Sequence, residues 1–173
     1  KNFQNINIFK LNEDNVLETL NKYKFLENIY VNKIIPSTIN INLSKTAILG
    51  KTFRDGENFF IGKNGNFINS NQLLEKNKIP ELFGDFEIND FLHLQKILKI
   101  NDLDVNKIEK YYYFKNKRWD LLFSNGLTLK LPSKDIEKSI KIFKEMYISN
   151  NLINTKIIDL RVNNQIILTN KNE

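Results

Sequence analysis

The chain has 173 residues, which suits one medium-sized domain or two small ones, and it contains no Cys, which excludes disulfides, thiolate metal sites and a cysteine nucleophile. Its net charge of +6 raises the possibility of a nucleic-acid ligand. However, 20 acidic residues are interleaved with the basic ones, and few of the basic residues are Arg, the side chain that most often reads base edges. Nucleic-acid binding is therefore the alternative and not the preferred interpretation.

The first quarter of the chain predicts a helix followed by a β-hairpin. Asn12 can cap a helix that runs to about Tyr23, because its side chain can accept hydrogen bonds from the first backbone N–H groups of the helix. Two strands are expected over residues 28–35 and 38–43, with a turn at Pro36-Ser37. The apolar residues that alternate with polar ones in the second strand, and should form its buried face, are Ile39, Ile41 and Leu43.

From residue 47 onward the pattern predicts a mostly antiparallel sheet with covering helices. Turn residues such as Asp55-Gly56 separate short apolar stretches, as expected for a meander. The expected elements are strands over residues 47–53, 58–61 and 67–68, a short helix over 73–76, a loop over 80–84, a helix over 90–98 and a strand over 107–114.

The stretch Arg118–Pro132 predicts a β-hairpin closed by Asn125-Gly126. This dipeptide favours a type I′ turn, because both central positions of that turn need positive φ. A helix over 133–149 follows, with an apolar face, and two strands over 156–162 and 165–169 end the chain. The residues expected on the apolar face of that helix are Ile136, Ile140, Phe143 and Tyr147.

No constellation for catalysis or metal binding stands out. His93 is the single histidine, so metal sites built from several histidines are excluded, and we expect it on a helix surface. Asp102 and Asp104 resemble the start of a calcium loop, but the Gly and Glu that complete such a loop are missing. Tyr111–Phe114 is the aromatic platform that a nucleic-acid-binding module would use, although an aromatic strand with two faces is more typical of a core.

The last two predicted strands form a hairpin if Asn163-Asn164 is a two-residue turn. In that register Asp159 lies opposite Leu168, and Ile166 and Leu168 share the outer face with the charged residues. Apolar side chains beside charges on a chain-terminal strand are typical of a docking strip. A longer loop would change the register and turn Ile166 inward, and both registers stay open. The residues expected to share the inner face are Ile158, Leu160, Val162 and Ile167.

Five short motifs, in order along nearly the whole chain, resemble the extracytoplasmic part of the bacterial cell-division family FtsQ, called DivIB in other bacteria. The motifs are Ile29–Val31 leading to Pro36–Ile41, Phe60–Gly65, Ile79–Gly84, Arg118–Asp120 with Asn125–Pro132, and Ile158–Arg161.

This resemblance implies an α+β fold, with a POTRA unit over residues 1–46 and a β domain over 47–173. It implies no catalysis and no cofactor. The family is a scaffold that recruits the FtsB–FtsL pair and influences septal peptidoglycan synthesis, and its POTRA part is a candidate site for other division proteins. Because the chain starts with Lys1, we expect a fragment whose single anchoring helix lies upstream, with this region outside the cytoplasm.

Three departures from the family pattern are visible. The first strand and helix of a POTRA unit are absent, and Thr46 stands where the family often has Pro. Val162 replaces a common Tyr, so no aromatic anchor is expected there. The resemblance also implies that FtsB adds a strand to the edge formed by the last strand. The residues that we predict to contact the partner are Asp159, Arg161, Val162, Asn164, Ile166 and Leu168.

Overall fold

The computed structural model describes residues 7–149, 152, 154–162 and 165–171. It contains three α-helices and eleven β-strands within that part of the chain, together with two short 3₁₀ turns. In chain order the helices and strands are α1 (Glu13–Asn21), β1 (Leu26–Ile34), β2 (Thr38–Lys45), β3 (Ile48–Arg54), β4 (Glu57–Gly62), β5 (Phe67–Asn69), β6 (Glu81–Phe83), α2 (Ile88–Ile100), β7 (Ile108–Tyr113), β8 (Trp119–Phe123), β9 (Thr128–Lys130), α3 (Ile136–Ile148), β10 (Thr155–Asp159) and β11 (Ile167–Asn170).

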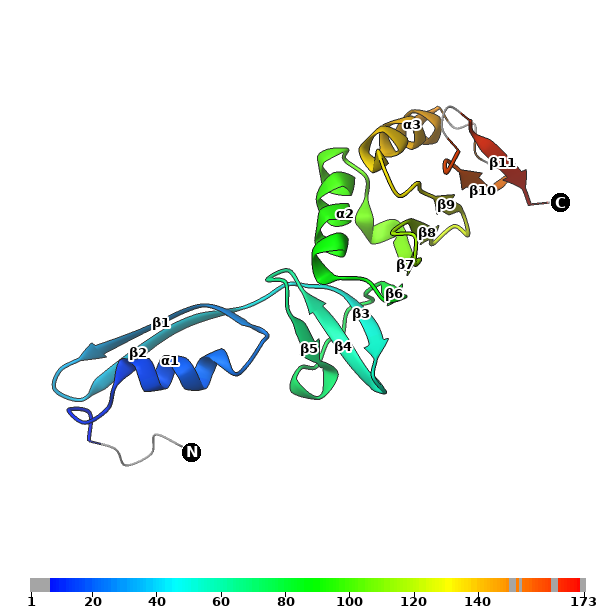
Figure 1. Ribbon diagram of the computed structural model, residues 1–173. Coiled ribbons are helices and arrows are strands. Elements are labelled where there is room, and N and C mark those ends of the chain that lie inside the picture. The colour runs from blue at the N-terminus through cyan, green and yellow to red at the C-terminus, as the bar shows by residue number, and fades with distance from the viewer. Residues whose placement is uncertain (1–6, 150–151, 153, 163–164, 172–173) are drawn as a thin grey trace.

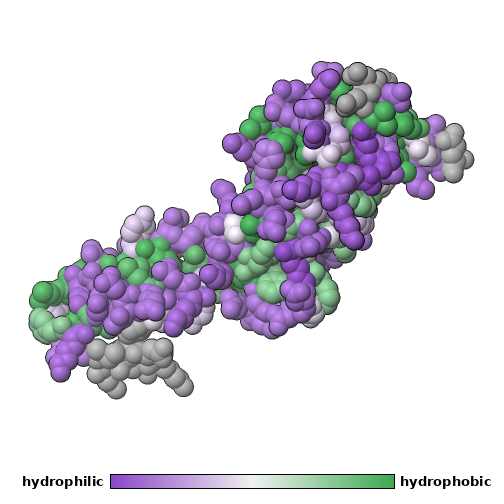
Figure 2. All heavy atoms as spheres, viewed as in Figure 1, coloured by the Kyte–Doolittle hydropathy of each residue, from purple (hydrophilic) through white to green (hydrophobic). Residues whose placement is uncertain are grey.

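The N-terminal unit consists of α1 and the separate two-stranded sheet β1–β2 (Figure 1). Asn12 caps α1 as predicted, since its side chain accepts a hydrogen bond from the Asp14 N–H at 2.9 Å. The expected buried face of the second strand is wrong in part, because α1 packs against β1. Ile41 and Leu43 on β2 are consequently 41% and 46% exposed. Figure 2 shows hydrophobic residues along this unit and at its far tip.

The other nine strands form one sheet in the order β11-β10-β9-β8-β7-β6-β3-β4-β5. Neighbouring strands are antiparallel except for β3–β6, β6–β7 and β9–β10, which are parallel. Helices α2 and α3 pack on one face of this sheet (Figure 1). The predicted α+β class with a mostly antiparallel sheet is therefore confirmed.

One cross-strand row forms the centre of the core. Leu82, Tyr111, Leu121, Leu129 and Ile158 are consecutive neighbours on β6, β7, β8, β9 and β10, and each is at most 1% exposed. They pack with the apolar faces of α2 and α3, where burial of each large side chain contributes about 1.5–3 kcal/mol. The buried helix residues there include Phe91, Leu94 and Leu98 of α2 and Ile140 and Phe143 of α3, and the last two were predicted on the apolar face of their helix.

On β6 to β10, the residues next to the core row form a second cross-strand row. Their side chains point to the opposite face of the sheet, which we call the open face. This second row runs through Phe83, Tyr112, Asp120, Lys130 and Asp159 on β6 to β10. Because successive side chains of a strand alternate between faces, this row belongs to the side away from the core row. It continues to Phe53 on β3 and Ile167 on β11.

Two predicted elements are wrong. No helix forms over residues 73–76, and the helical turn lies slightly earlier, at Ser70–Gln72. The predicted loop over 80–84 contains strand β6, which is only three residues long. Its partners β3 and β7 lie far away in the sequence, so no local hairpin signal marks it.

The turn at Asn125-Gly126 exists, but its predicted type is wrong. Only Gly126 has positive φ, at 83°, whereas a type I′ turn needs positive φ at both central residues. The Gly126 N–H donates to the Phe123 carbonyl and the Phe123 N–H donates to the Leu127 carbonyl, both at 2.9 Å. This pattern is that of a type I turn followed by a left-handed Gly. The Asn125 side chain stabilises it by accepting from the Leu127 N–H at 3.1 Å.

Candidate functional site

The candidate site is the end of the nine-stranded sheet formed by β11. Within the described residues, β11 pairs with β10 on one side and has no strand on the other. The backbone N–H and C=O groups on its free side are therefore available to a further strand. The other end of the sheet is β5.

Of the two registers that the sequence left open for this hairpin, the structure has the one with the longer loop, which is shifted by one residue from the register with a two-residue turn. Asp159 lies opposite Ile167 rather than Leu168, and Ile158 lies opposite Leu168. Ile167 therefore belongs to the open face. Leu168 lies next to Ile158 and so continues the core row onto β11. Both side chains remain about half exposed, at 47% and 45%.

The cause of the shift is the early end of β10 at Asp159. The Asp159 carboxylate accepts a hydrogen bond from the Arg161 N–H at 3.0 Å, which turns the chain where a strand to residue 162 was predicted. The connection to β11 is therefore longer than two residues. The predicted turn at Asn163-Asn164, and with it the candidate contact residue Asn164, lies outside the described residues.

Arg161 is engaged with Asp159 in its own chain. Its Nε lies 2.8 and 2.9 Å from the two carboxylate oxygens, and an Nη lies 2.5 Å from Oδ2. The hydrogen bond from Arg161 holds the pKa of the Asp159 carboxyl below its usual value. About a third of the Arg161 side chain stays exposed, so a partner carboxylate would share the guanidinium with Asp159.

Further charged groups lie beside this pair on the open face. Lys130 is between Asp159 and Asp120 in the cross-strand row. Burial raises the pKa of Asp120, although Arg118 and Lys130 partly offset this effect. The Arg118 Nε lies 3.8 Å from the Asp120 Oδ1, and neither atom has a hydrogen-bond partner within the described part of the chain.

Apolar side chains surround the free edge. Four of them are close to half exposed, and three of these, Val162, Ile166 and Leu168, are residues that the sequence assigned to the contact. Ile167 was assigned to the inner face only in the register with a two-residue turn, and it was therefore missed as a contact residue. The four side chains are Val162, Ile166, Ile167 and Leu168.

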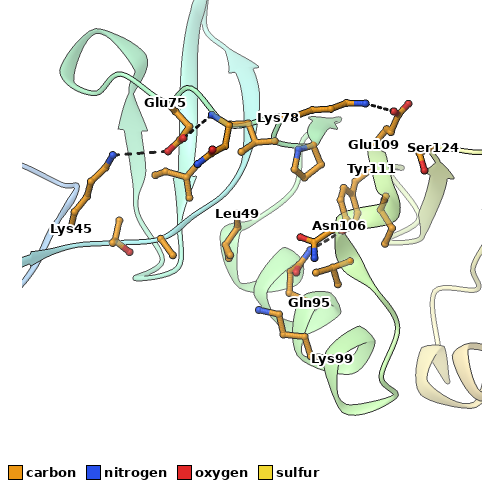
Figure 3. Close-up of a pocket in the computed structure, with 18 residues that line it drawn as sticks. Lys45, Leu49, Glu75, Lys78, Gln95, Lys99, Asn106, Glu109, Tyr111 and Ser124 are labelled. Carbon is orange, nitrogen blue, oxygen red and sulfur yellow. Dashed lines mark hydrogen bonds and ion pairs between the residues drawn. The ribbon is translucent and has the colours of Figure 1, made fainter.

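A separate cavity of about 620 Å³ lies between β3, α2, β7 and the segment from Glu75 to Pro80 (Figure 3). Ion pairs cross its rim, with Lys45 and Glu75 at 4.0 Å and Lys78 and Glu109 at 2.5 Å. On its wall, the Gln95 Nε2 donates to the buried Tyr111 hydroxyl at 2.9 Å, and burial raises the pKa of that hydroxyl. Its polar groups thus largely satisfy one another.

The other residues that the sequence analysis considered for catalysis, metal binding or nucleic-acid binding do not come together in a second site. His93 is exposed on α2, and Asp102 forms an ion pair with Lys144 at 3.0 Å. Among the residues that the structure describes, no group of three or more His, Asp or Glu gathers as a metal site. Tyr111 is fully buried and Tyr113 donates to the Asp90 carboxylate at 2.8 Å, so Tyr111–Phe114 is not one aromatic platform.

The longest of the described helices, α2 and α3, have 13 residues each. None of the described helices is both long enough and apolar enough to span a membrane.

Residues 52–161 match the family model described as "Cell division protein FtsQ/DivIB, C-terminal". The chain is 28% identical over 165 residues to the "Cell division protein FtsQ" of Rickettsia bellii, covering 91% of this chain and 60% of that protein. It is 22% identical over 161 residues to the "Cell division protein FtsQ" of Rhizobium radiobacter, covering 90% and 75%. The chain thus spans about 60% of the length of the Rickettsia relative.

Among solved structures, the chain is similar to the major extracytoplasmic domain of the bacterial cell division protein DivIB from Geobacillus stearothermophilus. The TM-score is 0.42 and the sequence identity 10%, with 64% of this chain and 98% of that chain covered.

Proposed function

The chain belongs to the FtsQ/DivIB family of cell division proteins, and we propose that it is a non-catalytic scaffold of the division machinery. In this proposal the free side of β11 binds the FtsB–FtsL pair, and the complex helps to control septal peptidoglycan synthesis. The region lies outside the cytoplasm and is anchored to the inner membrane by one helix of the longer protein.

The observation that carries the proposal is the position of β11 at the end of the sheet. A partner segment in extended conformation can add a strand there through main-chain hydrogen bonds, which is a common mode of peptide recognition. Apolar side chains on both faces of the edge then supply specific contacts.

Strand addition alone is too weak to hold a partner. About four main-chain hydrogen bonds along this short strand contribute roughly 2–6 kcal/mol, at about 0.5–1.5 kcal/mol each. Association costs about 4–15 kcal/mol in lost freedom of motion. Burial of apolar side chains must therefore supply the remainder, and Ile167 and Leu168 stand directly on the edge, one on each face.

The Asp159–Arg161 pair limits what Arg161 can contribute to binding a partner. Because its guanidinium already binds Asp159, a partner carboxylate would join an existing ion pair and gain less than from a free Arg. We therefore propose that apolar contacts, and not Arg161, dominate the affinity. Val162 and Ile166 complete the contact from the preceding segment.

We further propose that residues 1–46 are a POTRA unit, a candidate site for other division proteins, and that 47–173 form the β domain. The separation of β1–β2 from the nine-stranded sheet supports this division.

The test is a calorimetric titration of the chain with the FtsB–FtsL pair of the same organism. We expect Ile167→Asp and Leu168→Asp each to weaken binding at least about tenfold, because a charge would enter an apolar contact. The matched control is Leu74→Asp, an 88% exposed Leu outside this edge, which should bind like the unmodified chain. Unchanged affinity in both edge variants would exclude the edge, and failure of the unmodified chain to bind would exclude the partner.

A further inference from the structure

The open face carries exposed aromatic side chains well away from the terminal edge. Phe53 on β3, Phe83 on β6 and Tyr112 on β7 follow one another across three neighbouring strands, and Phe114 lies two residues beyond Tyr112. Phe53 is 66% exposed, Phe83 41% and Phe114 37%. We call these four residues the aromatic strip. Three strands, β8, β9 and β10, separate it from β11.

The strip is a connected surface and not a set of isolated side chains. The rings of Phe83 and Tyr112 stack with their centroids 5.1 Å apart and their planes 15° from parallel. Phe53 and Phe83 line one shallow hollow of about 140 Å³ together with Lys51 and Glu81. Contiguous exposed apolar surface of this kind typically marks an interaction site.

The charges around the strip are mainly positive. Lys51 and Lys110 flank Glu81, with nitrogen–oxygen distances of 3.0 and 3.8 Å, and Lys110 also lies 5.8 Å from the centre of the Phe83 ring. At the other end, the Arg118 guanidinium lies 4.2 Å from the centre of the Phe114 ring. The exposed turn between Phe114 and Arg118 adds Lys115 and Lys117. The acidic groups Glu81 and Asp120 are each already paired with a basic side chain.

The orientation of the rings favours a protein ligand over a nucleic acid. Nucleobases bind by stacking on free ring faces. Phe83 and Tyr112 stack on each other, so one face of each ring is already covered, and Lys110 lies 5.8 Å from the centre of the Phe83 ring. Aliphatic and aromatic side chains of a protein can also pack against ring edges, as in edge-to-face aromatic pairs.

We propose that the aromatic strip is a second protein-docking surface, separate from β11. Its occupant is a partner segment with apolar side chains flanked by carboxylates. The apolar side chains pack against Phe53, Phe83 and Tyr112, and the carboxylates pair with the surrounding lysines. This charge pattern gives the surface a preference for acidic over basic segments.

Two synthetic peptides test the proposal, both with the same Phe, Leu and Ile residues, one flanked by Glu and the other by Lys. Amide shifts in NMR spectra locate each peptide on the chain and give its affinity. We expect the Glu-flanked peptide to bind at least about tenfold more tightly, with shifts on β3, β6 and β7. The exposed double variant Phe53→Ser/Phe83→Ser should lose this binding, and Ile167→Asp at the other site should retain it.

A charge variant separates the role of the lysines from that of the rings. Lys115→Glu/Lys117→Glu lies in the exposed turn after β7 and should reduce or invert the preference between the two peptides. Three outcomes would each overturn the proposal. They are equal binding of both peptides to the unmodified chain, retained binding in the Phe53→Ser/Phe83→Ser variant, and amide shifts confined to β11. Tighter binding of an oligothymidylate, with a steep dependence on salt, would also overturn it and assign the strip to nucleic acid.

Discussion

At the scale of single residues, Asp159 decides the geometry of the candidate site. Its carboxylate binds both the backbone N–H and the guanidinium of Arg161, and it thereby ends β10. The sequence predicts an extended segment at Ile158–Arg161, because apolar and charged residues alternate there. It does not reveal that an Asp side chain will bind its own backbone two residues later, and this local bond moved the register by one residue.

The same pair predicts a pH-dependent contribution to stability. Because the folded-state pKa of Asp159 is lowered by Arg161, the pair stabilises the fold above the unfolded-state pKa, and this contribution disappears as pH falls through the folded value. Arg161→Gln should therefore lower the unfolding free energy at pH 7 by about 0.5–1 kcal/mol, a small loss because the pair is partly exposed. Urea denaturation at pH 7 and pH 3 measures the difference.

The expected loss is smaller at pH 3, because the contribution of the pair decreases as the pH falls below the unfolded-state pKa of Asp159 toward its lowered folded-state pKa. Arg161→Lys keeps the positive charge, so its unfolding free energy should lie between those of the unmodified chain and Arg161→Gln. A loss of the same size at both pH values would show that the ion pair is not its cause.

At the scale of elements, helices and local hairpins were predictable and strand β6 was not. The apolar spacing in α2 and α3 and the turn residues around β3–β4 and β8–β9 are local signals. β6 has three residues between Pro80 and Gly84, and it is defined by parallel pairing with β3 and β7, which only the folded chain brings together. Pairing between distant segments leaves no periodic pattern in so short a strand.

The closeness of β6 to β7 depends on Gly84. Its φ is +101°, and a Cβ atom there would lie 2.2 Å from the Tyr113 carbonyl oxygen. We expect Gly84→Ala to lower the unfolding free energy by about 3 kcal/mol or more, because strain and a backbone clash act together. Urea denaturation followed by Trp119 fluorescence measures the change.

Gly126→Ala is the matched control, since φ is +83° but nothing lies within 4 Å of the added Cβ. This substitution should lower the unfolding free energy by only about 1–2 kcal/mol, which is the strain of a non-Gly residue in the left-handed conformation. Equal losses in the two variants would contradict the role of close packing between β6 and β7.

At the scale of the whole molecule, the long sheet places its two candidate surfaces apart. β11 ends the sheet, and the aromatic strip crosses β3, β6 and β7 on the open face. A scaffold benefits from this arrangement because two partners can bind without competing for the same residues. The edge at β11 was predictable because the residues of β10 and β11 have the local pattern of a hairpin. The strip was not, because Phe53, Phe83 and Tyr112 are far apart in the sequence.

Hydrogen exchange at β11 tests the central claim most directly. The amides of Ile167–Asn170 that point away from β10 should exchange rapidly in the free chain, because they lack a strand partner. Binding of the FtsB–FtsL pair should slow their exchange at least about tenfold, while the amides of β5 at the other end of the sheet stay unchanged. A complex that forms without any added protection at β11 would contradict the account.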